Sequence, residues 1–382
     1  MQNIIVSKFK EIFGTGCALY AAPGRVNLIG EHTDYNGGYV LPGAIDKAIY
    51  VAIKPNGGAK ARIFSVQNDE MAEFRLCESD IPAFQWARYP FGVCMEMIKR
   101  DGRVEGFDAV VSGDVPLGAG LSSSAALCSA FAFALNDIFG CGFERAELAL
   151  IGQSTEHNYE GVKCGIMDQF ASIFGRKGNI IRLNCNTLDY EYIPFDPESA
   201  GYRLVLLDTR VKHELASSAY NRRRESCENA VEAIRKRHPE VEVLWDVEPD
   251  WLEEVRGEIS AEDFKRAEYV TGEKQRIQCF CEALEEDDYE TAGEMMYLTH
   301  EGLSKLYEVS CPELDFLNEV ACHESVTGSR MMGGGFGGCT INLVGADRYD
   351  AFVDAAKTEF AAKFGHEPSV YDVVISDGAR KL

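Results

Sequence analysis

Residues 24–38 have the sequence GRVNLIGEHTDYNGG. This stretch sets Arg25, Glu31, His32 and Asp34 among glycines and beside a short apolar run. A packed core has no use for four such groups together, because each needs a partner or water when it is buried. A solvated turn with ordinary charges is the simpler interpretation. We favour a binding site for a small, hydroxyl-rich ligand with an anionic group nearby, because polar side chains are gathered on a backbone shaped by glycine.

A second glycine-rich segment, VPLGAGLSSSAA at residues 115–126, joins a predicted strand to a predicted helix. A helix N-terminus offers unpaired N–H groups and the positive end of the helix dipole, which suit phosphate oxygens. Small residues let the backbone approach a ligand, and serine hydroxyls can donate to phosphate or coordinate Mg²⁺. The segment matches neither the G-x-x-x-x-G-K-[ST] loop nor the protein-kinase glycine loop. Simple N-capping of the helix by serine is the alternative.

A third segment, MMGGGFGGC at residues 331–339, has five glycines within six positions. Such density requires backbone freedom or very close packing. A mobile turn is one interpretation. The β-prone run Thr340–Val344 that follows favours a built loop that leads into the core.

The composition limits the class of partner. The chain of 382 residues has 38 basic and 61 acidic residues, which gives a formal net charge of −23. We therefore expect no nucleic-acid partner and no anionic membrane partner, since no basic surplus is available to meet phosphates. A nucleotide can still bind locally, through backbone N–H groups, one arginine and a metal ion.

The cysteines and the N-terminus indicate the compartment. The 13 cysteines are scattered without a C-x-x-C pair, and an odd count fits a disulfide framework poorly. Met1–Phe13 lacks the apolar core of a signal peptide, and the longest apolar stretch, about residues 125–135, is shorter than the roughly 20 residues that span a bilayer. We expect a soluble, cytoplasmic protein with reduced thiols, and a monomer.

Hydrophobic periodicity predicts a mixed α+β chain in two lobes, residues 1–200 and 201–382. The region from about residue 217 to residue 320 is mainly helical and acidic. The predicted strands are Tyr39–Leu41, Ala48–Ile53, Arg62–Val66, Phe107–Ser112, Asn179–Leu183, Arg203–Asp208, Cys339–Val344 and Tyr371–Ile375. Four further helices are predicted at Pro90–Lys99, Ser123–Phe139, Glu144–Tyr159 and Tyr349–Phe364.

The three glycine-rich segments together resemble those of the GHMP small-molecule kinases, and the first narrows the resemblance to the galactokinase family. Residues 213–224 (HELASSAYNRRR), 307–314 (YEVSCPEL) and 376–379 (SDGA) also look like that family, so the resemblance covers nearly the whole chain. One departure is Met332, where the family usually has threonine before the glycines. The position lies in a loop that we do not expect to be catalytic.

The resemblance implies a two-lobed GHMP kinase fold, in which the N-terminal lobe resembles domain 2 of ribosomal protein S5. The C-terminal lobe would be ferredoxin-like α/β with extra helices. The implied reaction moves the γ-phosphoryl group of ATP, with Mg²⁺, to the anomeric hydroxyl of α-D-galactose, as in the Leloir pathway. The alternatives are a kinase for a related sugar such as N-acetylgalactosamine, and a non-catalytic galactose and ATP sensor. Such sensors lack a Ser-Ala pair after the serine run, whereas Ser124 and Ala125 are present here.

The resemblance also assigns roles to residues. Asp168 matches the proposed catalytic base, although a lone aspartate there could otherwise cap a helix; Arg25 matches the residue that would hold Asp168 ionised and stabilise the moving phosphoryl group. Glu156 and Ser124 match the Mg²⁺ ligands. The positions that match sugar contacts are Glu31, His32, Asp34, Gly165 and Tyr220. The positions expected at the nucleotide are Ser65, Gly118, Ala119, Gly120, Leu121, Ser122, Ser123 and Ser124.

Overall fold

The computed structural model describes residues 1–116, 118–211 and 216–382, and strands in these ranges form three sheets. The largest has the order β13-β1-β3-β6-β4-β5 and is antiparallel except where β4 runs parallel to β6. Its strands are β1 (Ala18–Asn27), β3 (Pro42–Pro55), β4 (Lys60–Ser65), β5 (Glu70–Arg75), β6 (Phe107–Gly113) and β13 (Arg380–Lys381).

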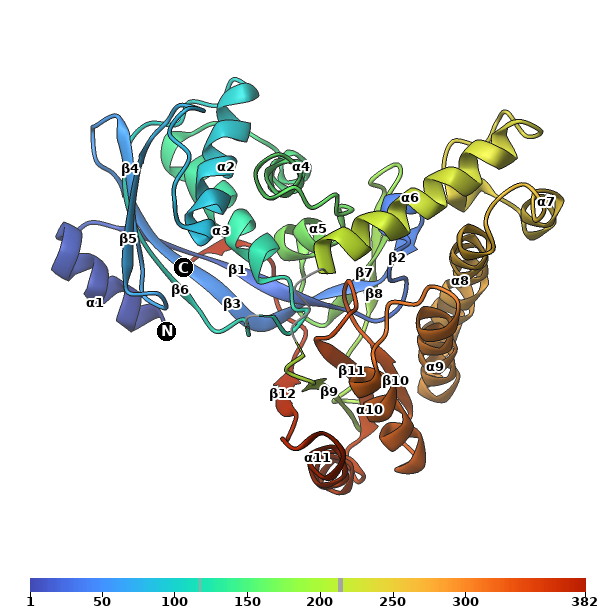
Figure 1. The fold of residues 1–382 in the computed structure, drawn as a ribbon. Helices are drawn as coiled ribbons and strands as arrows, with labels where there is room; N and C mark the ends of the chain where they lie inside the picture. Colours follow the sequence, from blue (N-terminus) through green and yellow to red (C-terminus); the bar gives the residue numbers. More distant parts are fainter. Residues whose placement is uncertain (117, 212–215) are drawn as a thin grey trace.

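Helices cover both faces of this first sheet, because its strands alternate apolar side chains between the two faces (Figure 1). Ala52 and Val110 point to one face, where they pack against α1 (Gln2–Phe13). Val51 and Val111 point to the other, larger core. That core is covered by α2 (Gln85–Lys99), α3 (Ser123–Phe139), α4 (Arg145–Thr155) and α5 (Met167–Phe174).

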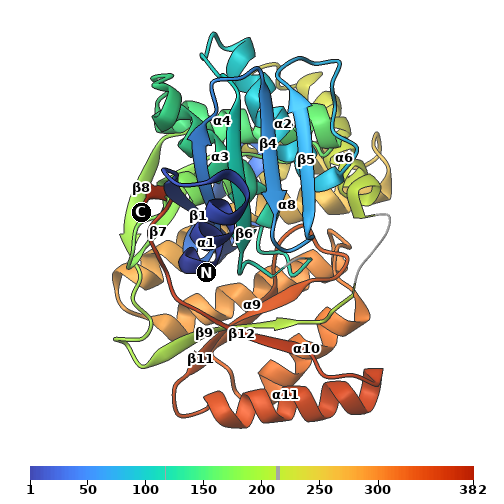
Figure 2. The same cartoon turned by 90° about the vertical axis from the view of Figure 1, so that its left-hand side faces the viewer.

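A second, antiparallel sheet lies below the first in Figure 2 and has the order β10-β11-β9-β12. Its strands are β9 (Tyr202–Asp208), β10 (Gly328–Met331), β11 (Cys339–Gly345) and β12 (Ser369–Val373). The helices α10 (Pro312–His323) and α11 (Tyr349–Phe364) pack on it through a separate apolar cluster. A third, small sheet joins β2 (Tyr39–Val40), β7 (Asn179–Asn184) and β8 (Tyr190–Pro194).

The region between β9 and β10 is helical. Its described residues form α6 (Ala216–Arg235), α7 (Pro249–Glu254), α8 (Ala261–Glu285) and α9 (Tyr289–Lys305), and α10 follows them. These helices enclose their own apolar cluster around Tyr269 and Tyr307. No helix in the described ranges combines the length and the apolar character needed to cross a bilayer.

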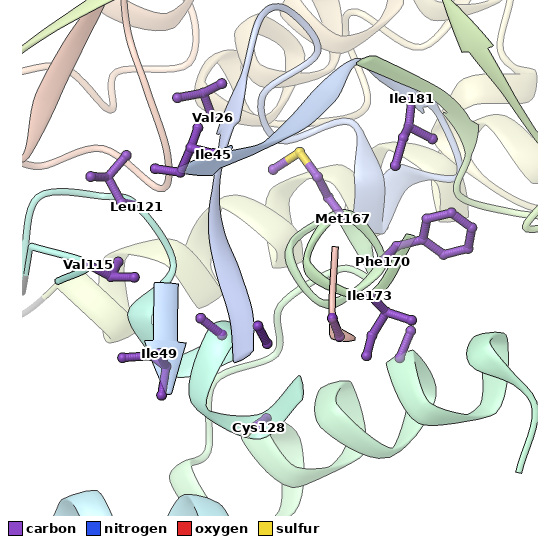
Figure 3. Packing of buried hydrophobic residues seen from close by; sticks show 14 of the residues in the cluster. Val26, Ile45, Ile49, Val115, Leu121, Cys128, Met167, Phe170, Ile173 and Ile181 are labelled. Atoms are coloured by element: carbon purple, nitrogen blue, oxygen red, sulfur yellow. The ribbon is translucent and has the colours of Figure 1, made fainter. Parts of the chain in front are cut away.

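The largest core anchors the loops that carry the glycine-rich segments. Leu121 of the second segment and Met167, next to Asp168, are both buried in it, together with Val26 of the first segment (Figure 3). Side chains with polar roles are therefore set on backbone whose neighbours are fixed by packing.

The predicted α+β class is confirmed, and α3 and α11 have the predicted bounds. Other bounds differ. The helix predicted at Pro90–Lys99 begins earlier, at Gln85, and α4 ends at Thr155, where a π-helical turn, Glu156–Glu160, takes over. Strand β12 lies two residues before the predicted Tyr371–Ile375. The division at residue 200 stays a prediction, and so do the matches at residue 117 and residues 213–215, which lie outside the described ranges.

Candidate active site

A cavity of about 230 Å³ brings together residues from the first and third glycine-rich segments and from three places between them in the chain, at Glu156, around Asp168 and at Tyr220. The predicted site residues that line it are Arg25, Glu31, His32, Asp34, Glu156, Gly165, Asp168 and Tyr220. The third glycine-rich segment also lines it, through Gly333, Gly334, Gly335 and Phe336. We did not predict these four as site residues, although the density of glycine was a signal for close approach.

Arg25 and Asp168 form the charged centre of the cavity. The Arg25 guanidinium donates from Nε to Asp168 Oδ1 at 2.8 Å and from Nη2 to Oδ2 at 3.0 Å. Its Nη1 donates to the carbonyl of Gly120 at 2.6 Å, and Ser122 Oγ donates to Asp168 Oδ2. Arg25 lies on β1, directly after an irregularity in the pairing with β3. Such irregularities re-aim a side chain, and here the arginine points at the aspartate.

His32 lines the cavity with a buried imidazole ring. Its Nδ1 shares a hydrogen bond of 2.7 Å with the hydroxyl of Tyr35, whereas Nε2 is buried and has no partner among the described residues. Burial, and then the charge of Arg223, lower the pKa of His32 to about 3. The imidazole is therefore neutral at physiological pH. The ring of Tyr220 lies 5.2 Å from that of His32 and forms the adjoining wall.

Asp34 and Gly165 are in close contact. A Cβ atom at Gly165 would lie 2.0 Å from Asp34 Oδ2, so a side chain there would displace the carboxylate. Burial, and then the nearby charge of Asp168, raise the pKa of Asp34 to about 7. The cavity therefore holds a carboxyl group that is only partly ionised near neutral pH.

Glu156 begins the π-helical turn that follows α4. Its Oε1 accepts hydrogen bonds from Ser124 Oγ at 3.2 Å and from Gln169 Nε2 at 3.0 Å. Burial, and then the charge of Asp168, raise the pKa of Glu156 to about 7. The described residues contain no group of three or more His, Cys, Asp or Glu side chains arranged to hold a metal by themselves.

The second glycine-rich segment lies beside this centre. Ala119 and Leu121 are buried in the core, and helix α3 begins at Ser123. The expected capping by serine is wrong for Ser122: it is the N-cap residue, but its hydroxyl donates to Asp168 and makes no cap hydrogen bond. The N–H groups of the first turn of α3 consequently gain no acceptor from the N-cap side chain.

A second cavity, of about 470 Å³, includes the first turn of α3 in its lining. Ser65, Ser123 and Ser124 line it together with aromatic side chains, Phe84, Trp86 and Tyr89. Because Ser124 lines this cavity and donates to Glu156, which lines the first, the two cavities meet at the start of α3.

Two family models match this architecture. A model described as GHMP kinases N terminal domain matches residues 88–176, and one described as GHMP kinases C terminal matches residues 280–362. A mevalonate kinase from Methanococcus jannaschii has the same fold, with a TM-score of 0.67 at 18% identity over 95% of this chain and 99% of that one. The predicted fold is thus confirmed, and the protein is a GHMP kinase.

More specific matches narrow the class. The model described as galactokinase galactose-binding signature matches residues 7–55. A galactokinase of Thermotoga maritima is 40% identical over 94% of this chain and 99% of its own length, and one of Fusobacterium nucleatum is 39% identical over the whole of both. The structure of Lactococcus lactis galactokinase complexed with galactose gives a TM-score of 0.95 at 33% identity over all of both chains. The chain belongs to the galactokinase family, whose members are ATP-dependent sugar kinases.

Two charged residues near the site had no signal in the sequence. Arg330, on β10, donates to Glu31 Oε1 at 3.2 Å. Glu273, on α8, accepts a hydrogen bond from the backbone N–H of Gly30 at 3.2 Å. Each is a single charged residue far from the first segment in the chain, so only the folded structure brings them to it.

Proposed function

We propose that the protein transfers the γ-phosphoryl group of ATP to the anomeric hydroxyl of α-D-galactose and releases α-D-galactose 1-phosphate and ADP. The observation that carries the proposal is the Arg25–Asp168 pair between a polar cavity and the N-terminus of α3. Phosphoryl transfer depends mostly on positioning and on the neutralisation of charge, and this arrangement offers both.

Asp168 is proposed as the base. Its Oδ2 already accepts from Arg25 and Ser122, whereas Oδ1 accepts only from Arg25 Nε among the contacts described. A carboxylate oxygen has two lone pairs, so Oδ1 can take a hydrogen bond from the sugar hydroxyl. As that oxygen bonds to phosphorus and the bond to ADP breaks, the proton passes to Asp168. Arg25 keeps its positive charge beside Asp168 and the transferring phosphoryl group.

The nucleotide is proposed to lie across the second cavity and the start of α3. Its base would stack among Phe84, Trp86 and Tyr89, near Ser65. The phosphates would be held by the backbone from Gly118 to Ser124, at the positive end of α3.

The acidic lining supports the proposal of a divalent cation. The first cavity is lined by four carboxyl groups, from Glu31, Asp34, Glu156 and Asp168. The cationic side chain in the lining is that of Arg25. Ser124 and Glu156 would hold Mg²⁺ and leave its other positions to phosphate oxygens and water, as Mg²⁺ prefers. When bound, the ion would neutralise charge on the transferring phosphoryl group.

The sugar is proposed to lie against Glu31, His32, Asp34, Gly165 and Tyr220. The free Nε2 of His32 supports this assignment, since a buried polar atom without a partner is explained by a ligand that supplies one.

The decisive test compares kcat/KM for galactose, glucose and N-acetylgalactosamine at saturating ATP and Mg²⁺. We expect galactose to be strongly preferred, since a site closed around a plain hydroxyl rejects an acetamido group and an epimer loses hydrogen bonds. A rate with N-acetylgalactosamine that equals the galactose rate would favour the kinase for a related sugar. Tight binding of galactose and ATP without turnover would favour the sensor.

We also propose that the enzyme works as a cytoplasmic monomer that binds neither nucleic acid nor membranes, with two lobes divided near residue 200. The net charge of −23 supports the absence of nucleic-acid and membrane partners, and the 13 free thiols support a reducing compartment. Light scattering on the purified protein tests the monomer, limited proteolysis tests the lobes, and fractionation of the source cells tests the compartment.

A further inference from the structure

Arg330 is a fully buried cation to which the proposed phosphoryl transfer assigns no role. It lies on β10 with an exposure of 0%, and no other fully buried side chain is larger among the described residues. Its Nε donates to the carbonyl of Leu28 at 2.8 Å, and Nη2 donates to the carbonyl of Asn27. Its Nη1 donates to the carbonyl of Met331 at 2.7 Å. The guanidinium therefore joins the second sheet to the backbone of the first glycine-rich segment.

Glu31 is the anion that compensates this buried charge. Its Oε1 accepts from Arg330 Nη2 at 3.2 Å and from the N–H of Gly333 at 2.8 Å. Its Oε2 accepts from Asn27 Nδ2 at 3.1 Å. Glu31 is itself 1% exposed, and it lines the first cavity.

Counting lone pairs gives the capacity of Glu31 toward a ligand. A carboxylate has about four acceptor positions, two on each oxygen. Both positions on Oε1 are taken by Arg330 and Gly333, and one on Oε2 is taken by Asn27. One position on Oε2 is left, and it can accept a hydrogen bond from one hydroxyl group.

We propose that Arg330 is a positioning residue for sugar recognition, which fixes Glu31 so that it accepts a hydrogen bond from a single sugar hydroxyl. The proposal rests on the proposed function, because it takes the first cavity as the sugar site. It follows that one hydroxyl of the sugar donates a hydrogen bond to the Glu31 carboxylate, which can only accept hydrogen bonds. A hydrogen or fluorine atom at that carbon cannot donate, so it leaves a buried acceptor unpaired, which costs binding.

Lysine cannot replace this arginine without loss. The guanidinium directs five N–H donors in a fixed plane, and here they meet three carbonyls and one carboxylate. An ammonium group keeps the charge but has three donors on a flexible stem. Arg330→Lys thus preserves the ion pair while it removes the orientation.

The experiment measures galactose binding by calorimetry without ATP, for the wild type, Arg330→Lys and Glu31→Gln. The ligands are galactose and its monodeoxy and monofluoro forms at each carbon that carries a free hydroxyl group. Arg266→Lys is the matched control, because Arg266 is a buried arginine that pairs with Glu262 and Ser226 instead of the site.

We expect Arg330→Lys to weaken galactose binding by about tenfold or more, while the KM for ATP changes by less than about twofold. In the wild type, deoxy and fluoro substitution at one carbon should each weaken binding by about tenfold or more through Glu31. That penalty should shrink in both Arg330→Lys and Glu31→Gln, and the penalties at the other carbons should persist. Arg266→Lys should keep the wild-type pattern.

Three results would overturn the proposal: unchanged galactose binding in Arg330→Lys, equal weakening for every sugar with the pattern retained, or altered penalties at several carbons. If Arg330→Lys does not fold, Glu31→Gln decides: a change at one carbon supports the proposal, and a change at none or at several overturns it. If the wild type binds another sugar instead of galactose, the proposed function is wrong but the proposal for Arg330 is not. The proposal for Arg330 is then tested with the deoxy forms of that other sugar in the same variants.

Discussion

Asp34→Asn should stabilise the ligand-free protein at alkaline pH while it weakens sugar binding. The carboxyl group is partly buried and close to Asp168, and its pKa is raised to about 7 from an ordinary value of 3.8. An acid whose pKa is higher in the folded chain favours folding below 3.8 and loses that contribution as the pH rises to about 7. Asparagine has the same shape as the neutral acid and never takes the charge.

The magnitude follows from the pH interval. Between pH 5 and the folded-state pKa of about 7, each pH unit is worth about 1.36 kcal/mol, so the free energy of unfolding of the wild type should fall by up to about 3 kcal/mol relative to Asp34→Asn. This is an upper limit, because Asp34 is only partly buried.

The assay is urea unfolding of both proteins, without ligand, at pH 5 and pH 8.5. Asp354→Asn is the control, because that aspartate is exposed on α11. Galactose affinity at pH 8.5 should fall by about tenfold or more in Asp34→Asn, since a charged acceptor is lost. A stability difference that is the same at both pH values would refute the argument that the buried charge of Asp34 destabilises the free site.

Three further variants test the proposed reaction. Asp168→Asn should lower kcat by about 10²–10⁴-fold while galactose and ATP still bind, because the amide cannot accept the proton; near-normal turnover would remove Asp168 from the mechanism. Gly120→Val should weaken ATP binding strongly and galactose binding much less, because Gly120 has φ +75 in the second glycine-rich segment, which we propose to hold the phosphates; loss of sugar binding with intact ATP binding would mean that the sugar and nucleotide cavities were assigned the wrong way round. Ser124→Ala should raise the Mg²⁺ concentration needed for half-maximal rate without a change in galactose affinity, and an unchanged Mg²⁺ requirement would remove Ser124 from the ion.

The sequence predicted helices and strands well where the local signals, such as glycine turns and apolar periodicity, were strong. Helix α3 was predicted at about its observed bounds, because a glycine turn precedes it and Gly140 ends it in the left-handed region. Strand β1 was not named, since its Ala-Ala-Pro-Gly centre has little β propensity; its pairing along β3 over most of its length overrides that weakness. The π-helical turn at Glu156 was also missed, because nothing in the sequence Glu-His-Asn-Tyr-Glu distinguishes a π-helical turn from a continuing α-helix.

The site residues also divide into those that the sequence indicated and those that only the structure revealed. Arg25, Glu31 and Asp34 were found because they lie close together in one segment that no core would tolerate. Arg330 and Glu273 were not, because their partners include backbone groups of Leu28 and Gly30, which carry no sequence signal. Long-range hydrogen bonds to main-chain atoms are visible only after folding.

The pairing of β13 with β1 has a consequence for biosynthesis. Ala21, near the start of the chain, finds its edge partner in Arg380, and Asp137 meets Lys381. On the ribosome, the β1 edge of the first sheet therefore stays unpaired until residues 380–381 have emerged. Unpaired edges invite association with other chains. We expect nascent chains that stall before residue 380 to depend on chaperones far more than the finished enzyme does.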